Sequence, residues 1–195
     1  MVAELKKLKC GKIYEDVDLK KITSYKLKGK AKCVIIPNDQ KGLINLFDYI
    51  KKKNLKYKII GGGSNLIFDG DYDGILIRLD KFDHLKIEDT KIVVGAGYNL
   101  IRLALKCARN SLTGLEFATG IPGTVGGAIV NNAGAYKSDM GYIVEEVLVI
   151  TPELEIKKLY NRDLNFHYRT SFFKENKDYI ILQATIVLKR GKKDA

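Results

Sequence analysis

The chain has 195 residues, with 34 Lys and Arg against 23 Asp and Glu, which gives a formal net charge of +11. A hydrophobic fraction of 46% and a mean hydropathy of −0.13 are typical of a folded globule and argue against disorder. With 3 Pro and 18 Gly, collagen-like and proline-rich chains are excluded. The longest apolar runs are strand-sized, far below the about 18 residues of a membrane-spanning helix, and residues 1–10 hold no apolar core of a signal peptide.

The cysteines and histidines are too few and too scattered for a metal site or a disulfide scaffold. Cys10, Cys33 and Cys107 are odd in number and form no Cys-x-x-Cys pair. His84 and His167 are the only histidines, so a site with several histidines is impossible. We therefore expect no metal and a cytoplasmic, reducing location.

The positive charge has two interpretations. The plainer one is a solvated face of scattered lysines, such as those at 51–53. The other is attraction of a polyanion, either a nucleic acid or a phosphorylated small molecule. No zinc finger, RNA-recognition motif or basic region with heptads supports specific nucleic-acid binding.

The first half of the chain predicts a small α+β lobe that ends near residue 80. Residues 33–37 read as a buried strand that is stopped by a proline, and residues 57–60 and 74–79 as two more. A helix is expected over residues 39–53, because its apolar residues follow the helical period. These residues are Leu43, Leu46, Phe47 and Ile50.

The second half predicts a hairpin, a helix and three further strands. Residues 84–88 and 91–94 form the expected hairpin. Asn99 is positioned to cap a helix with the buried stripe Leu100, Leu103, Ala104 and Cys107. After a glycine-rich segment over residues 114–141, strands are expected over residues 145–151, 155–160 and 179–189.

The first glycine loop, Gly61-Gly62-Gly63-Ser64-Asn65, directly follows a predicted strand. Glycines let a ligand approach backbone N–H groups, and such a nest of donors suits a pyrophosphate. The alternative is a tight turn between strands.

The second glycine loop covers residues 120–128 and continues through residues 131–136. Its density of small residues suits a flat wall against an extended ligand. It equally suits a small-residue helix packed closely on a sheet, and the two are compatible.

Two commoner nucleotide motifs are rejected. Residues 91–97 open like a Rossmann strand with Gly-x-Gly, but Leu100 stands where the third glycine belongs. A Walker A loop needs Gly-Lys-Ser/Thr, which neither Gly11-Lys12 nor Gly29-Lys30 continues into.

Several segments together resemble the UDP-N-acetylenolpyruvoylglucosamine reductase (MurB) family, whose members are flavoenzymes. They occur in the family's order and span about residues 20–190. The matching segments are Thr23–Leu27 with Gly29 and Ala31, Gly61–Leu66, Gly114–Phe117, Gly120–Ala128, Asn132–Tyr136, and Phe166–Arg169 with Ser171 and Phe173.

The resemblance implies an α+β, two-subdomain FAD-binding fold of the PCMH or vanillyl-alcohol-oxidase type. It divides the chain into an N-terminal extension (1–20), subdomain 1 (21–80), subdomain 2 (81–190) and a tail (191–195), with an extended, non-covalent FAD clasped between the subdomains. The implied pyrophosphate residues are Gly61, Gly62, Gly63, Ser64, Asn65 and Leu66. Those along the flavin and ribityl chain are Gly120, Ile121, Pro122, Gly123, Thr124, Gly126, Gly127, Asn132, Ala133 and Gly134.

The resemblance also implies a reaction in peptidoglycan synthesis. NADPH passes a hydride to FAD, which passes it to the enolpyruvyl ether of a UDP-sugar and so makes UDP-N-acetylmuramate. Arg169 matches the family's catalytic arginine, and Tyr168 would line the substrate site. A surface ion pair is the alternative for Arg169.

The sequence departs from the family in its length. Members usually run about 100 residues longer and end in a substrate-binding domain that supplies a serine as proton donor. We find no such serine segment after residue 190. A shortened chain, a natural short relative and one half of a split enzyme all remain open, as does a flavin-binding module without reductase activity. A basic nucleic-acid-binding domain is the third alternative.

Overall fold

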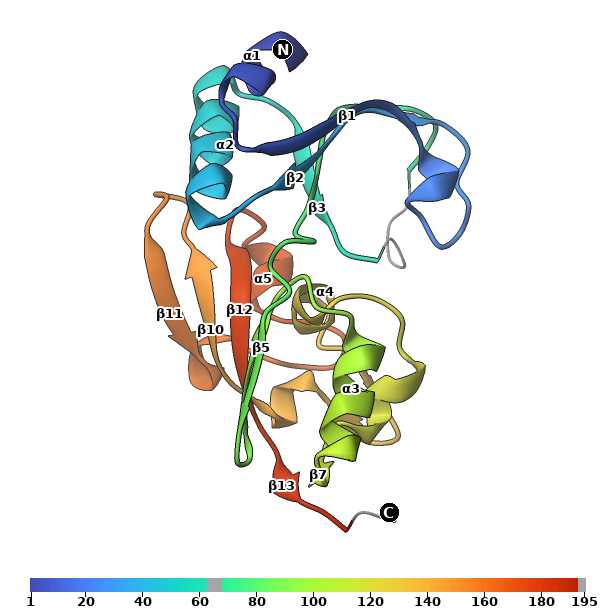
Figure 1. Ribbon diagram of the computed structural model, residues 1–195, viewed down its shortest axis with the longest axis vertical. Helices are drawn as coiled ribbons and strands as arrows, with labels where there is room; N and C mark the ends of the chain where they lie inside the picture. Colours follow the sequence, from blue (N-terminus) through green and yellow to red (C-terminus); the bar gives the residue numbers. More distant parts are fainter. Residues whose placement is uncertain (63–67, 193–195) are drawn as a thin grey trace. The chain divides into compact units, whose positions relative to one another are not determined.

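The computed structural model (Figure 1) describes residues 1–62 and 68–192 and consists of two units, Met1–Lys81 and Phe82–Ala195. Each unit has its own sheet and its own core. The division lies next to the one expected near residue 80.

Unit 1 is a four-stranded sheet in the order β1-β2-β4-β3. β1 runs antiparallel to β2, whereas β2 and β3 both run parallel to β4. The elements are α1 (Val2–Lys7), β1 (Gly11–Asp18), η1 (Leu19–Lys21), β2 (Lys30–Pro37), α2 (Gln40–Lys53), β3 (Tyr57–Ile60) and β4 (Tyr72–Arg78). The three predicted strands and the predicted helix are therefore confirmed.

Helix α2 forms where its capping residues and apolar stripe place it. The Asp39 carboxylate accepts a hydrogen bond from the Gly42 N–H at 2.8 Å, and Asn54 ends the helix in the left-handed conformation, with φ of 50°. The predicted stripe is buried. Its burial contributes to the apolar core of unit 1.

The N-terminal residues differ from the expected extension. Strand β1 pairs with β2 from Gly11 opposite Pro37 to Asp18 opposite Lys30. Leu5 is fully buried. Residues 1–20 therefore belong to unit 1. β1 carries mostly polar residues, as sheet-edge strands do, and so lacks the apolar signal of a strand.

Unit 2 is a five-stranded antiparallel sheet in the order β11-β10-β12-β6-β5, flanked by short helices. Its main elements are β5 (Leu85–Glu88), β6 (Lys91–Gly95), α3 (Leu100–Arg109), α4 (Val125–Val130), β10 (Val144–Ile150), β11 (Ile156–Tyr160), α5 (Phe172–Glu175) and β12 (Ile180–Val187). The smaller ones are β7 (Leu112–Thr113), η2 (Glu116–Gly120), β8 (Gly134–Ala135), β9 (Ser138–Asp139), η3 (Met140–Tyr142), η4 (Asn161–Asp163) and β13 (Lys189–Arg190). The predicted hairpin, helix and strands are confirmed, and Asn99 caps α3 through its bond from the Arg102 N–H at 2.9 Å.

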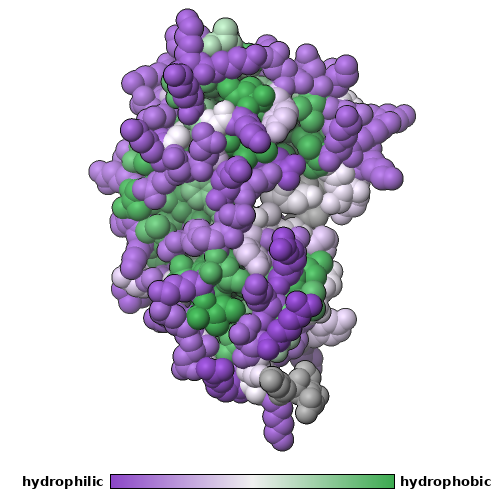
Figure 2. Space-filling model, in the orientation of Figure 1, coloured by the Kyte–Doolittle hydropathy of each residue, from purple (hydrophilic) through white to green (hydrophobic). Residues whose placement is uncertain are grey.

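The positive charge is unevenly distributed. Met1–Lys81 has 18 Lys and Arg and 10 Asp and Glu, a net charge of +8, which leaves +3 for the other residues. In Figure 2, hydrophilic residues project from unit 1 around smaller apolar areas. Among the described residues, every helix is too short or too polar to span a bilayer.

Candidate functional site

The start of helix α4 is already saturated with hydrogen bonds. The Val125 N–H donates to the Tyr98 carbonyl and the Gly126 N–H to the Ala96 carbonyl, both at 2.9 Å. The Gly127 N–H donates to the hydroxyl of Thr124, the N-cap residue, at 3.3 Å. The first two bonds hold the glycine segment to the rest of unit 2, and the third caps α4, so none of these three donors is directed at a phosphate.

Close packing explains why one position of this segment is glycine, but it does not explain another. A Cβ built at Gly126 would lie 3.1 Å from the Ala96 Cβ and 3.2 Å from the Ala96 carbonyl oxygen. A Cβ at Gly120 would meet nothing within 4 Å. Gly123, with φ of +125°, needs the backbone freedom of glycine. Close packing on the protein therefore applies to Gly126, whereas Gly120 borders open space, and the interpretation of the segment as a wall against a ligand stays a prediction.

The next predicted residues, Ala133 and Gly134, shape a tight hairpin. The Ala133 N–H donates to the Ala128 carbonyl at 2.8 Å. A Cβ at Gly134 would lie 2.5 Å from the Ser138 carbonyl oxygen, so no side chain fits there. The hairpin therefore requires Gly134 for its own packing.

Asn132 has a side chain that faces the protein. It is only 2% exposed and adopts the left-handed conformation, with φ of 44°. Its Nδ2 donates to the His167 carbonyl at 2.8 Å, and its Oδ1 accepts from the Gly141 N–H at 2.8 Å. The expected contact of Asn132 with FAD could therefore come only from its backbone.

Tyr168 and Arg169 form the tip of a turn. His167 and Thr170 flank them and exchange two backbone hydrogen bonds of 3.1 Å. Tyr168 is 83% exposed, and the Arg169 guanidinium carbon lies 5.4 Å from the centre of its ring. Arg169 has φ of +51°, a left-handed conformation that is uncommon for residues other than glycine.

Ser171 fastens the same turn to helix α4. Its buried hydroxyl donates to the Val130 carbonyl at 2.7 Å and accepts from the Phe173 N–H at 3.2 Å, which caps α5. The hydroxyl proton is thus committed to a carbonyl. Ser171 is anchored in the protein and is not presented to a substrate.

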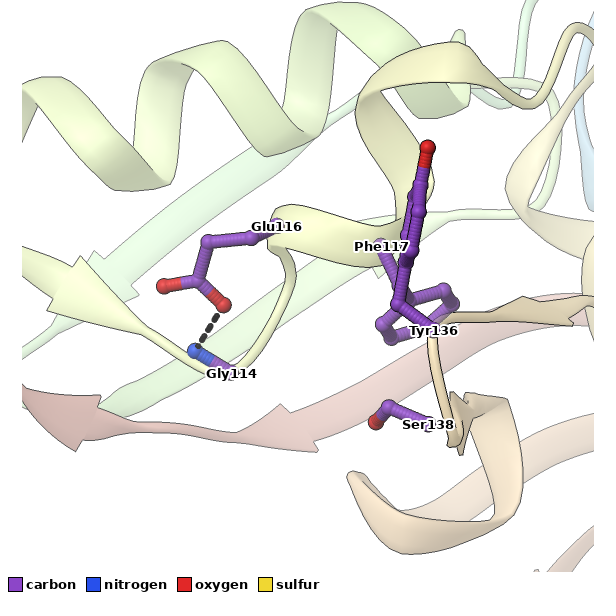
Figure 3. A pocket seen from close by; sticks show the side chains of 5 residues that line it. All are labelled: Gly114, Glu116, Phe117, Tyr136 and Ser138. Atoms are coloured by element: carbon purple, nitrogen blue, oxygen red, sulfur yellow. Dashed lines mark hydrogen bonds between the residues drawn. The ribbon is translucent and has the colours of Figure 1, made fainter.

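A pocket of about 410 Å³ lies in unit 2 and is lined by Gly114, Glu116, Phe117, Tyr136 and Ser138 (Figure 3). Phe117, Tyr136 and Ser138 lie together on one side, and the Glu116 carboxylate accepts from the Gly114 N–H at 2.8 Å on the other. Burial by itself raises the pKa of the Glu116 carboxyl. Hydrogen bonds from the Thr113 hydroxyl and from backbone N–H groups outweigh it and hold that pKa below its usual value. The motif resemblance covered Glu116 and Tyr136, but no role was predicted for either.

The first glycine loop lies in unit 1 and is described only at its start. The Gly62 carbonyl accepts from the Ser24 hydroxyl at 3.3 Å. The ammonium of Lys58 lies 5.0 Å from the ring centre of Phe68, which is the first described residue after the loop. A positive charge therefore lies next to the end of the loop. Four predicted residues, Gly63, Ser64, Asn65 and Leu66, lie outside the described residues.

Comparison with known proteins identifies the class. A family described as "FAD binding domain" matches residues 31–160. The structure is similar to UDP-N-acetylenolpyruvylglucosamine reductase (MurB) from Thermus caldophilus, with a TM-score of 0.79 and 29% identity over 94% of this chain and 65% of that one. Alkyldihydroxyacetonephosphate synthase shares the fold, with a TM-score of 0.61 and 14% identity over 85% of this chain and 33% of that one. These similarities confirm the α+β FAD-binding fold of the PCMH or vanillyl-alcohol-oxidase type.

The chain belongs to the FAD-binding domain family. Curated relatives confirm the finer resemblance seen in the motifs. UDP-N-acetylenolpyruvoylglucosamine reductase from Halalkalibacterium halodurans is 40% identical over 196 residues, and the one from Bacillus subtilis is 36% identical over 197 residues. Each alignment covers 100% of this chain but 65% of the relative, so the chain spans about two thirds of the length of these reductases.

Proposed function

We propose that this chain is the flavin-binding portion of a UDP-N-acetylenolpyruvoylglucosamine reductase. In this proposal NADPH is the reductant, and the product is UDP-N-acetylmuramate for peptidoglycan. The observation that carries it is similarity to such reductases along the whole chain, including the turn that bears Tyr168 and Arg169.

Two of the residues that the motifs assign to FAD, Gly120 and Gly62, support its binding. Gly120 borders open space, and its lack of a side chain leaves the backbone accessible to a ligand. In unit 1, Gly62 is exposed beside a strand end, where its N–H can approach a phosphate. When bound, FAD would supply hydride transfer from NADPH to the enolpyruvyl group.

Arg169 is the residue that we assign to charge stabilisation. Negative charge develops on the substrate carboxylate as the enolpyruvyl group is reduced, and a planar guanidinium can hold a carboxylate through two hydrogen bonds. Its exposed position on a fastened turn supports this role. Tyr168, exposed next to it, would line the same substrate site.

A substrate-binding domain outside these 195 residues is part of the proposal. Because the reductases are longer than this chain, we propose that such a domain supplies the proton donor in the active enzyme. A cytoplasmic location is also proposed. It is supported by three free, buried cysteines, of which burial raises the pKa of Cys33 and Cys107 to about 11.

Steady-state oxidation of NADPH tests the proposal. The FAD-loaded chain should oxidise NADPH faster in the presence of the UDP-enolpyruvyl sugar once the C-terminal domain of a relative is added. The same rate with and without the sugar would leave only a flavin-binding module. A flavin-binding module is the second candidate function for the chain alone. It is favoured because the Ser171 hydroxyl donates its proton to the Val130 carbonyl.

A further inference from the structure

The side chain of Asn132 hydrogen-bonds two other segments, one at Gly141 and one at His167, which lies 35 residues further along the chain. Its carboxamide uses one end for the Gly141 N–H and the other for the His167 carbonyl, each at 2.8 Å. The side chain is almost completely buried. The Asn132 end of each part-buried hydrogen bond is therefore shielded from water, so that water cannot easily replace a lost partner.

The segment that Asn132 holds has a strained backbone at its tip. Arg169 adopts a left-handed backbone at the tip of the turn, which is unfavourable for a residue with a side chain and persists only where the surrounding structure imposes it. Two hydrogen bonds tie this segment to the end of α4 and the residues after it: His167 to Asn132 on one side, and Ser171 to Val130 on the other. Tyr168 and Arg169 themselves are exposed.

We propose that Asn132 is a positioning residue, whose buried carboxamide holds the Tyr168–Arg169 turn in its strained conformation and so aims the Arg169 guanidinium. Its side chain then acts on the turn and not on a cofactor. The catalytic part of this inference rests on the proposed function of Arg169. The structural part stands without it.

The variants follow from the backbone at position 132. Alanine would add strain in the left-handed region, but glycine and aspartate both tolerate it. Asn132→Gly removes both hydrogen bonds. Asn132→Asp keeps the size and the acceptor for Gly141, but sets a carboxylate against the His167 carbonyl. Asn131→Asp is the matched control, because the Asn131 amide bonds only the Gly127 carbonyl of α4, at 3.2 Å.

Hydrogen exchange of the chain, resolved to single amides, tests the structural part. The Thr170 amide, which donates across the turn to His167, should exchange about tenfold faster in both Asn132 variants than in the parent. The Ala184 amide in β12 reports global opening and should change much less, and Asn131→Asp should leave Thr170 unchanged. Equal changes at Thr170 and Ala184, or none at Thr170, would overturn the proposal.

A double-mutant cycle tests the action through Arg169. In the NADPH assay with the added C-terminal domain, Asn132→Gly should lower kcat while FAD stays bound, and should cost nothing further once Arg169→Ala is present. Additive losses would overturn positioning of Arg169. If the parent shows no turnover at all, the proposed function fails, and the exchange result alone decides whether Asn132 holds the turn.

Discussion

The hydroxyl of Ser171 donates a hydrogen bond of 2.7 Å to the carbonyl of Val130, the last residue of α4. This bond joins the start of α5 to the end of α4. It also explains why a serine that follows a Tyr-Arg pair in sequence is unavailable as a proton donor.

Ser171→Ala should therefore lower the free energy of unfolding by about 1–2 kcal/mol, because it removes a buried hydrogen bond and a helix cap. Urea unfolding followed by circular dichroism measures the change. Ser24→Ala is the control, since that exposed hydroxyl makes a longer bond of 3.3 Å and should cost less than about 0.5 kcal/mol. If Ser171→Ala leaves the free energy of unfolding unchanged but abolishes turnover, Ser171 instead has a role in catalysis.

The same substitution should change stability at Gly126 but FAD binding at Gly120. Gly126→Ala places a methyl group 3.1 Å from the Ala96 Cβ and should destabilise unit 2 by about 1–3 kcal/mol. Gly120→Ala meets open space and should change stability by less than about 0.5 kcal/mol, but weaken FAD binding. Thermal unfolding and flavin titration measure both. Full FAD affinity in Gly120→Ala would remove that residue from the proposed site.

Gly62→Val tests the first glycine loop. A branched side chain would crowd the backbone where a phosphate is expected to approach, so FAD binding should be lost while circular dichroism still reports a folded chain. Gly62→Ala should give an intermediate affinity. If flavin affinity is the same in all three proteins, the loop does not hold the pyrophosphate.

Arg169→Ala tests the assigned catalytic residue. The 195 residues alone should bind FAD but reduce the UDP-enolpyruvyl sugar poorly, since general acid catalysis usually contributes about 10²–10⁴-fold and Ser171 is committed elsewhere. Adding the C-terminal domain of a relative should restore turnover. Arg169→Ala should then lower kcat by about 10²–10³-fold with the flavin still bound.

Arg169→Lys is the companion variant. It keeps the charge but loses the planar two-donor geometry, and we expect it to recover little of the rate. Full turnover by the chain alone would contradict the need for an external proton donor, and Tyr168 would become the first residue to test.

The charge of +8 in unit 1 should produce only weak, non-specific binding to nucleic acids. Because released counterions drive such binding, it should fall steeply as salt rises. Fluorescence anisotropy with labelled DNA and RNA at several salt concentrations measures this. Nanomolar, sequence-selective binding at physiological salt would instead favour a nucleic-acid-binding domain.

The elements that were predicted correctly are those whose local pattern matches their final environment. Helix α2 has a capping Asp39 and a buried apolar stripe, and α3 has a capping Asn99 with the same pattern. Strand β1 was not predicted, because Ile13 and Val17 are its few apolar residues and an edge strand needs no more. Its pairing with β2 is a tertiary feature without a local signal.

The candidate site was predictable in its motifs but not in its connections. The density of glycines at 120–127 indicated close backbone contact, and the structure divides it between protein packing at Gly126 and open space at Gly120. The role of Asn132 depends on His167, which lies 35 residues further along the chain. No spacing rule relates such a pair, so only the folded chain reveals that the amide faces the turn.

Flavin binding by the purified chain tests most directly whether the two glycine segments bind FAD. The protein should be stripped of cofactor, titrated with FAD and followed by visible absorption and by quenching of flavin fluorescence. We expect saturable, non-covalent binding of one FAD per chain, with a flavin spectrum that shifts on binding and a flavin that is released by denaturation. A chain that remains folded but leaves the spectrum of free FAD unchanged at saturating concentrations would contradict the assignment of both glycine segments to the cofactor.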